Sequence, residues 1–211
     1  MSIQGPPARQ PGWLPVLIGL AAFIVTAVAL GLVAWDWTGR NMEMNALVTA
    51  VEASEDAMGR TQEDLAATAA RLRTLTSDAQ KQRAIDDLVA GAQRGEMRIG
   101  SAGEVVGQVP VLPWHADIVE AKEAYIAHNL SWQVYMAAIA ADPKVYGTDQ
   151  PVIDATFMAA DPLMRAAVPD PPLFDLAQRV DRIFVEGAGP PPAPDGQEVA
   201  GGSEAVALRV D

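Results

Sequence analysis

The chain has 211 residues, with 27 acidic and 15 basic side chains, a formal net charge of −12 and no cysteine. The lack of cysteine excludes disulfides, a thiolate nucleophile and metal sites built on thiolates. The acidic balance argues against nucleic-acid binding, because phosphate recognition needs basic side chains. The length corresponds to roughly one to one and a half ordinary domains.

An uncharged apolar run occupies residues 12–35. In a helix it extends about 36 Å, which is enough to cross a hydrocarbon core of about 30 Å. Trp13 stands at one end of the run, and Trp35 and Trp37 stand at the other. Indoles favour the two headgroup layers of a bilayer. We therefore predict a transmembrane helix over residues 12–37, with these tryptophans as interface anchors and the lipid bilayer as a partner.

Two other interpretations of this run are a buried helix of a soluble core and a cleaved signal peptide. A core helix is rarely so apolar over this length, and the apolar region of a signal peptide usually spans about 7–15 residues. Ala27-Val28-Ala29 nevertheless has the small residues of a cleavage site. An uncleaved anchor is the preferred interpretation, and cleavage stays open.

Charges on the two sides of the run predict its orientation. Arg9 precedes it, whereas Asp36, Glu43 and Glu52 are among the acids that follow it. The positive-inside rule places residues 1–11 in the cytoplasm and residues 38–211 outside it. No second run is long enough for another crossing, so we predict a single-pass protein of the cell membrane.

The apolar spacing after this run predicts an all-α fold. Residues 41–92 have heptad-spaced apolar side chains, but an interruption at residues 74–78 leaves open whether they form one helix or two. Ser77 and Gln80 match a capping box that would begin the second helix, and Gly91 or Gly95 would end it. We expect a loop of extended character at residues 95–113, where glycine and proline separate β-branched residues.

The remaining helices are predicted from amphipathic spacing and from proline. Residues 114–141 have the clearest apolar stripe, and shorter helices are expected to begin at Pro151, Asp161-Pro162 and Asp170-Pro171, since an acid before proline suits a helix start. Residues 38–186 are therefore expected to form an up-down helical bundle. Residues 187–211 are rich in proline and glycine and acidic, which predicts a disordered tail.

An aromatic stripe on the 114–141 helix is the candidate ligand or partner groove. Tyr125 and Trp132 share one heptad column, and His128 and Tyr135 share the neighbouring column. Tyrosine and tryptophan combine apolar area with a polar tip, which suits a groove for a small ligand or a partner helix. Ordinary core packing is the plainer interpretation of the same stripe.

No catalytic arrangement is recognised, because the sequence has no nucleophile elbow, P-loop or dinucleotide-binding motif. His115, with Asp117 and Glu120 nearby, is interpreted as a surface residue at a helix start and not as a metal ligand. Paired acids such as Glu55-Asp56 are interpreted as solvated faces. We therefore expect no metal, no cofactor and no enzyme activity.

Two functions agree with these patterns. The first is a non-enzymatic, membrane-anchored protein-interaction module or accessory subunit that binds a membrane or cell-envelope protein. The second is an extracytoplasmic ligand-sensing bundle of the four-helix type that acts through a membrane partner. A membrane helix that continues into a long outer helix resembles, in architecture alone, the sensor half of bacterial chemoreceptors. The abundance of arginine over lysine indicates a bacterial source, and the sequence identifies no partner, ligand or oligomeric state.

Overall fold

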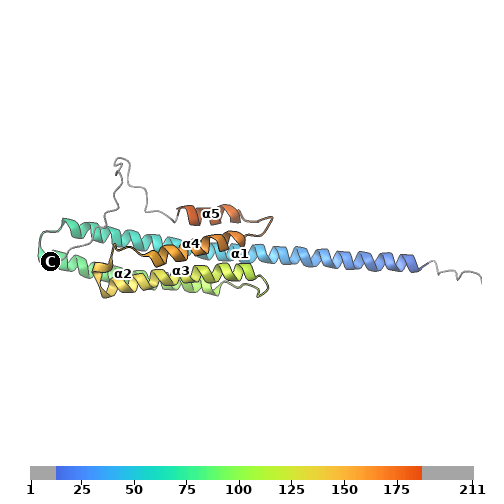
Figure 1. Cartoon of the computed structure of the whole chain (residues 1–211), viewed down its shortest axis with the longest axis horizontal. Helices are drawn as coiled ribbons and strands as arrows, with labels where there is room; N and C mark the ends of the chain where they lie inside the picture. The colour runs from blue at the N-terminus through green and yellow to red at the C-terminus, as the bar shows by residue number, and fades with distance from the viewer. Residues whose placement is uncertain (1–12, 187–211) are drawn as a thin grey trace, which may run out of the picture. The chain divides into compact units, whose positions relative to one another are not determined.

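The computed structural model describes residues 13–186, and these are helical without a strand. Five α-helices, α1 (Leu14–Thr74), α2 (Asp78–Gln108), α3 (Ala116–Ala141), α4 (Pro151–Ala166) and α5 (Leu176–Glu186), are joined by loops and by the 3-10 turn η1 (Pro143–Val145) (Figure 1). The predicted all-α fold is confirmed. The predicted cytoplasmic segment, residues 1–11, and the predicted tail, residues 187–211, lie outside the described residues.

The chain divides into two units, residues 1–40 and residues 41–211. The described part of the first unit belongs to α1, and its apolar side chains, such as those of Phe23 and Val25, are exposed. An 18-residue window of this helix has a mean hydropathy of 2.8, and none of it is buried. By length and composition α1 therefore qualifies as a helix that can cross a membrane.

The second unit has the hydrophobic core. Within it α3 lies between α2 and α4, and α5 packs against α4. The heptad-spaced residues Val51, Met58 and Leu65 of α1 are buried, and so are Ser54 and Thr61, which are also seven residues apart. The buried stripe of α1 is therefore broad enough to contact several helices at once, and it includes polar groups.

Helix α2 corrects the prediction that residues 95–113 form a loop, because it continues to Gln108. It begins at Asp78, as expected for a second helix, although the side chain of Ser77 forms no capping hydrogen bond. The glycines in this region are packing sites and not helix ends. A Cβ atom on Gly95 would lie 2.3 Å from Cγ2 of Thr61 and 3.2 Å from Sδ of Met136. Glycine therefore lets α2 approach α1 and α3 closely.

Two predicted helix starts are also wrong. Pro162 lies inside α4 and does not begin a new helix. Its neighbours Ala160 and Met164 are fully buried, so the packing of α4 outweighs the hydrogen bond that proline cannot donate. The last helix begins at Leu176 and not at Asp170-Pro171, because Phe174 and Asp175 have φ values of 60° and 52°, which no α-helix accepts.

Polar contacts attach α5 to α1. The Arg179 guanidinium donates to both carboxylate oxygens of Glu52, at 2.8 and 2.6 Å, and to the side chains of Asn45 and Thr49. These bonds hold the pKa of Glu52 below its usual value. Two parallel bonds between a guanidinium and a carboxylate fix both position and orientation, so this contact sets the place of α5 along α1.

The two glycines Gly95 and Gly59 provide a matched pair for testing the packing of α2. Gly95→Ala is expected to lower the free energy of unfolding by about 1–3 kcal/mol, because the new methyl group overlaps Thr61. Gly59, inside α1, has no atom within 4 Å of the position that a Cβ atom would take, so Gly59→Ala is expected to raise the free energy by about 0.5–1 kcal/mol. Chemical denaturation of the full chain in detergent, followed by circular dichroism, measures both. Equal effects of the two substitutions would contradict the close approach of α2.

Candidate binding site

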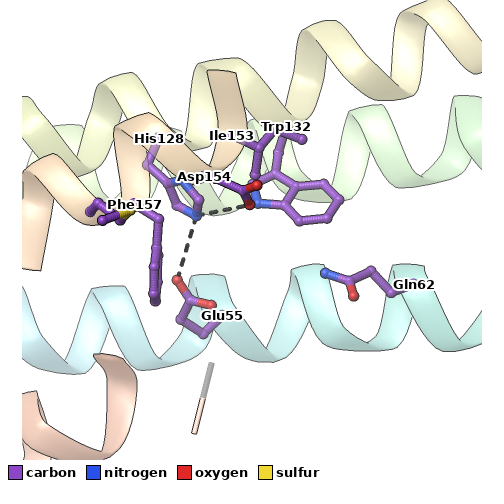
Figure 2. A pocket seen from close by; sticks show the side chains of 8 residues that line it. Glu55, Gln62, His128, Trp132, Ile153, Asp154 and Phe157 are labelled. Carbon is purple, nitrogen blue, oxygen red and sulfur yellow. Dashed lines mark hydrogen bonds and ion pairs between the residues drawn. The ribbon is translucent and has the colours of Figure 1, made fainter. Parts of the chain in front are cut away.

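A cleft of about 410 Å³ opens between α1, α3 and α4 in the second unit (Figure 2). Its lining combines carboxylates, aromatic rings and apolar side chains. The lining residues are Glu55 and Gln62 of α1, His128 and Trp132 of α3, and Ile153, Asp154, Phe157 and Met158 of α4. The size and mixed lining are typical of sites for small molecules.

His128 stands at the inner wall of this cleft, with 2% of its surface exposed. Its Nδ1 atom lies 3.2 Å from Oγ1 of Thr156, and its Nε2 atom accepts a hydrogen bond of 3.2 Å from the indole Nε1 of Trp132. An indole nitrogen can only donate, so Nε2 is unprotonated and the proton resides on Nδ1. His128 is therefore neutral in this arrangement.

Burial lowers the pKa of His128 from 6.5 to about 4. The physical cause is the removal of the imidazolium from water, which the nearby backbone carbonyl of Ile153 offsets only in part. Protonation at Nε2 would also oppose the indole N–H of Trp132. The hydrogen-bond geometry and the desolvation both favour the neutral imidazole.

Glu55 faces His128 across the cleft and is an exception to the interpretation of the paired acids as solvated faces, whereas the side chain of its neighbour Asp56 is 58% exposed. The Oε1 atom of Glu55 accepts a 2.6 Å hydrogen bond from the hydroxyl of Tyr125 and lies 3.9 Å from Nε2 of His128. Its side chain is 22% exposed. Burial raises the pKa of Glu55, and the Tyr125 hydroxyl lowers it by a smaller amount. This carboxyl group is thus a partly buried acid and not a surface charge.

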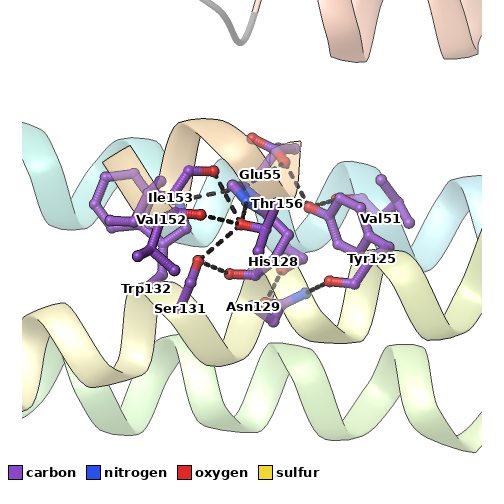
Figure 3. Close-up of polar contacts among 11 residues, drawn as sticks. Val51, Glu55, Tyr125, His128, Asn129, Ser131, Trp132, Val152, Ile153 and Thr156 are labelled. Atoms are coloured by element: carbon purple, nitrogen blue, oxygen red, sulfur yellow. Dashed lines mark hydrogen bonds and ion pairs between the residues drawn. The ribbon is translucent and has the colours of Figure 1, made fainter. Parts of the chain in front are cut away.

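A hydrogen-bond network behind the cleft connects the three helices, as Figure 3 shows. The Ser131 hydroxyl donates to the carbonyl oxygen of His128 and lies 3.1 Å from the Thr156 hydroxyl. The Ser54 hydroxyl donates to Oδ1 of Asn129 at 2.7 Å, and Nδ2 of Asn129 donates to the carbonyl of Tyr125. No buried side-chain nitrogen or oxygen of the described residues lacks a partner. The cleft therefore has a rigid inner wall.

The four residues predicted from the aromatic stripe separate into two pairs. His128 and Trp132 line the cleft. Tyr125 is fully buried beneath it and contacts two of its lining residues, Glu55 through the hydroxyl and His128 through the ring, with 5.8 Å between ring centroids. Tyr135 packs against Trp132, with 6.0 Å between ring centroids, and accepts a hydrogen bond from the backbone N–H of Gly147. Tyr125 and Tyr135 thus support the site without lining it.

Glu55 and the residues of α4 were missed as site residues. A sequence signal existed for Glu55, since it lies one turn after Val51 and one turn before Met58, both on the buried stripe of α1. No comparable signal existed for Asp154 or Phe157. Their place in the site depends on which face of α4 packs against α3, and spacing within α4 does not determine its neighbour.

His115 corrects a second prediction, because it is buried and not a surface residue. It is 1% exposed, and its Nδ1 atom lies 2.7 Å from Oε2 of Glu43 on α1. The same carboxylate oxygen accepts a hydrogen bond from the backbone N–H of Leu112. The contact attaches the loop before α3 to α1 and has a structural role.

The tryptophans predicted as membrane anchors belong to the first unit. Trp13 and Trp35 are exposed, and Trp37 is half-buried.

Among residues 13–186, no group of three His, Asp or Glu side chains has the geometry to hold a metal ion. Comparison of the chain with protein-family models, with curated proteins and with solved structures found no match.

The low pKa of His128 predicts a loss of stability at acid pH. The unfolded state takes up a proton near pH 6.5 and the folded state only near pH 4, so stability falls as pH decreases through this window. Glu55 acts in the opposite direction above pH 4.5, because burial raises its folded pKa. The difference between wild type and His128→Gln isolates the histidine. We expect this difference in unfolding free energy to shrink by about 2–3 kcal/mol from pH 7 to pH 4.

Denaturation of both proteins at a series of pH values measures this difference, and an NMR titration of the imidazole gives the pKa of His128 directly. A difference that does not depend on pH, or a titration midpoint near the ordinary value of about 6.5, would show that the imidazole is solvated in the folded protein.

Proposed function

We propose that the chain is a single-pass, membrane-anchored helical module whose second unit forms an up-down bundle outside the cytoplasm and acts as a non-enzymatic interaction or accessory subunit. One observation carries this proposal. The apolar window of α1 has a mean hydropathy of 2.8 and is 0% buried, although a separate core with its own buried residues follows in the same helix. A core helix of a soluble protein would bury most of such a window, whereas a bilayer solvates it.

Flanking charges and aromatic residues support this placement. Arg9 before the run and the acids after it favour a cytoplasmic N-terminus. Trp13 stands at one end of the run, and Trp35 and Trp37 stand at the other, as expected of indoles that favour the two headgroup layers.

The anchor is tested by alkaline carbonate extraction, by mass spectrometry of the mature N-terminus and by C-terminal reporter fusions. We expect the full chain to stay in the membrane pellet with residues 12–37 intact. A reporter that functions only outside the cytoplasm should give a signal when it is fused to the C-terminus. A mature chain that lacks the apolar run, or a fusion active only inside the cell, would contradict the proposal.

A matched pair of variants makes this test quantitative. Val25→Arg puts a charge at mid-span, which costs about 2.5–3.5 kcal/mol on insertion, and is expected to reduce the carbonate-resistant fraction. Val185→Arg makes the same change at an exposed position of α5 and should leave this fraction unchanged.

The role as an interaction module draws on exposed apolar side chains of the second unit. Leu130 and Val134 lie one turn apart on α3, and 57% and 62% of their surfaces are exposed. Apolar side chains that share one exposed face favour a contact with another protein.

Cross-linking in intact membranes tests this role. The double substitution Leu130→Glu with Val134→Glu is expected to abolish a cross-linked complex with a membrane or cell-envelope protein, while the melting temperature remains near that of wild type. Val152→Glu, at an exposed position of α4, is the control that should keep the complex. A complex that survives the double substitution would contradict a contact through this face.

A second function, an extracytoplasmic ligand-sensing bundle that acts through a membrane partner, is favoured by the cleft between α1, α3 and α4. A rigid wall of satisfied polar groups beside an open volume of about 410 Å³ is suited to a small ligand. In this function the ligand shifts the equilibrium of the bundle, and the partner transmits the change.

A further inference from the structure

The cleft combines negative charge with aromatic rings. Its lining contains two carboxylates, Glu55 and Asp154, and two large rings, Trp132 and Phe157. None of its eight lining residues is lysine or arginine. Figure 2 shows Glu55 on α1 facing the α3 and α4 side chains across the opening. A small molecule in this volume would therefore contact aromatic rings and at least one carboxylate together.

Glu55 has a hydrogen-bond donor but no permanent cation beside it. Tyr125 donates to its Oε1 atom. The basic group near it is His128, 3.9 Å away, whose Nε2 atom already accepts the indole N–H of Trp132. Elsewhere in the second unit a comparable acid is paired, since Glu52 binds Arg179 through both oxygens. Glu55 is thus a partly buried acid of the cleft that has no lysine or arginine among the lining residues.

We propose that this cleft binds a small organic cation, an ammonium group on an apolar body, with Glu55 as its counter-ion and with Trp132 and Phe157 around the apolar part. The inference rests on the ligand-sensing alternative above and does not depend on the membrane anchor. A cation gains Coulomb attraction from a carboxylate in a medium of low dielectric constant, and aromatic faces attract ammonium groups in addition.

Other ligand classes fit the lining less well. An anion would meet two carboxylates and no lysine or arginine, and the one imidazole, that of His128, is held neutral by its burial and by the indole N–H of Trp132. A neutral apolar molecule would displace water from Glu55 without replacing its hydrogen bonds, which costs binding energy. Burial raises the pKa of Glu55, so the surroundings already disfavour its bare charge, and a bound ammonium group would provide the missing compensation.

Three probes of similar size and different charge test the proposal. They are phenethylammonium, the neutral 2-phenylethanol and the anionic phenylacetate. Each is added to the full chain in lipid nanodiscs at neutral pH, and binding is measured by titration calorimetry and by the shift in melting temperature. We expect phenethylammonium to bind saturably, at least about tenfold more tightly than the alcohol, since a charge-assisted bond is stronger than a neutral one. Phenylacetate should not bind.

Matched variants assign the effect to Glu55. Glu55→Gln preserves the shape and an oxygen that accepts from Tyr125, and it should weaken phenethylammonium at least about tenfold while leaving the alcohol unchanged. Glu63→Gln makes the same change at an exposed position of α1 and should leave both affinities at the wild-type level. If Glu55→Gln melts below the working temperature, Asp154→Asn on the exposed side of α4 is used, with an expected loss of about twofold to threefold.

Each outcome of these titrations supports or overturns the inference. Equal affinity for the ammonium and alcohol probes, or an ammonium preference that survives Glu55→Gln, overturns the cation inference and leaves a ligand-binding cleft of other chemistry. Preferred binding of phenylacetate also overturns it. Failure of all three probes to bind at millimolar concentration overturns the inference, because the cleft then holds no ammonium group on an apolar body. The ligand-sensing function, which names no ligand class, does not depend on these three probes.

Discussion

The pairing of α3 with α1 through buried polar groups is the constraint on which the rest of the second unit depends. Ser54 donates to Asn129 at 2.7 Å, and the next residue of α1, Glu55, accepts from Tyr125 at 2.6 Å, one turn before Asn129 on α3. A shift of either helix by one turn would separate both pairs. Ser54 and Asn129 are fully buried, so water could not replace their contact, and each unsatisfied group would cost about 1–3 kcal/mol. Apolar contacts tolerate such a shift better, so the polar pairs fix the register.

This register determines the cleft. With α3 fixed on α1, His128 and Trp132 lie opposite Glu55, and α4 reaches the same place through the Thr156 hydroxyl, 3.2 Å from Nδ1 of His128. The cleft is therefore a consequence of three helices that meet at one polar cluster. Its inner wall is rigid because its buried polar groups are satisfied.

Sequence spacing predicted which faces of α1 and α3 are buried, but it did not predict the effects of contact between helices. The break near Ser77 and the helix at residues 116–141 follow from local patterns. Gly95 was predicted to end a helix and Asp161-Pro162 to begin one, because glycine and proline disfavour the interior of a helix. Close packing of Gly95 on Thr61 and the burial of α4 outweigh this local preference. The spacing within α3 likewise indicated His128 and Trp132 as site residues. The spacing within α4 did not indicate which face of that helix completes the cleft.

Two of the three titratable residues that line the cleft, His128 and Glu55, are largely buried, and their pKa values show the effect of this burial. Burial lowers the pKa of His128 and raises the pKa of Glu55, so both shifts favour the neutral form of the side chain. An acid and a base that face each other at 3.9 Å would exchange a proton and form an ion pair if the site were polar enough. Here the indole of Trp132 occupies the acceptor atom of His128, which prevents that exchange. The carboxyl group of Glu55 therefore depends on Tyr125, on solvent in the cleft or on a ligand for its stabilisation.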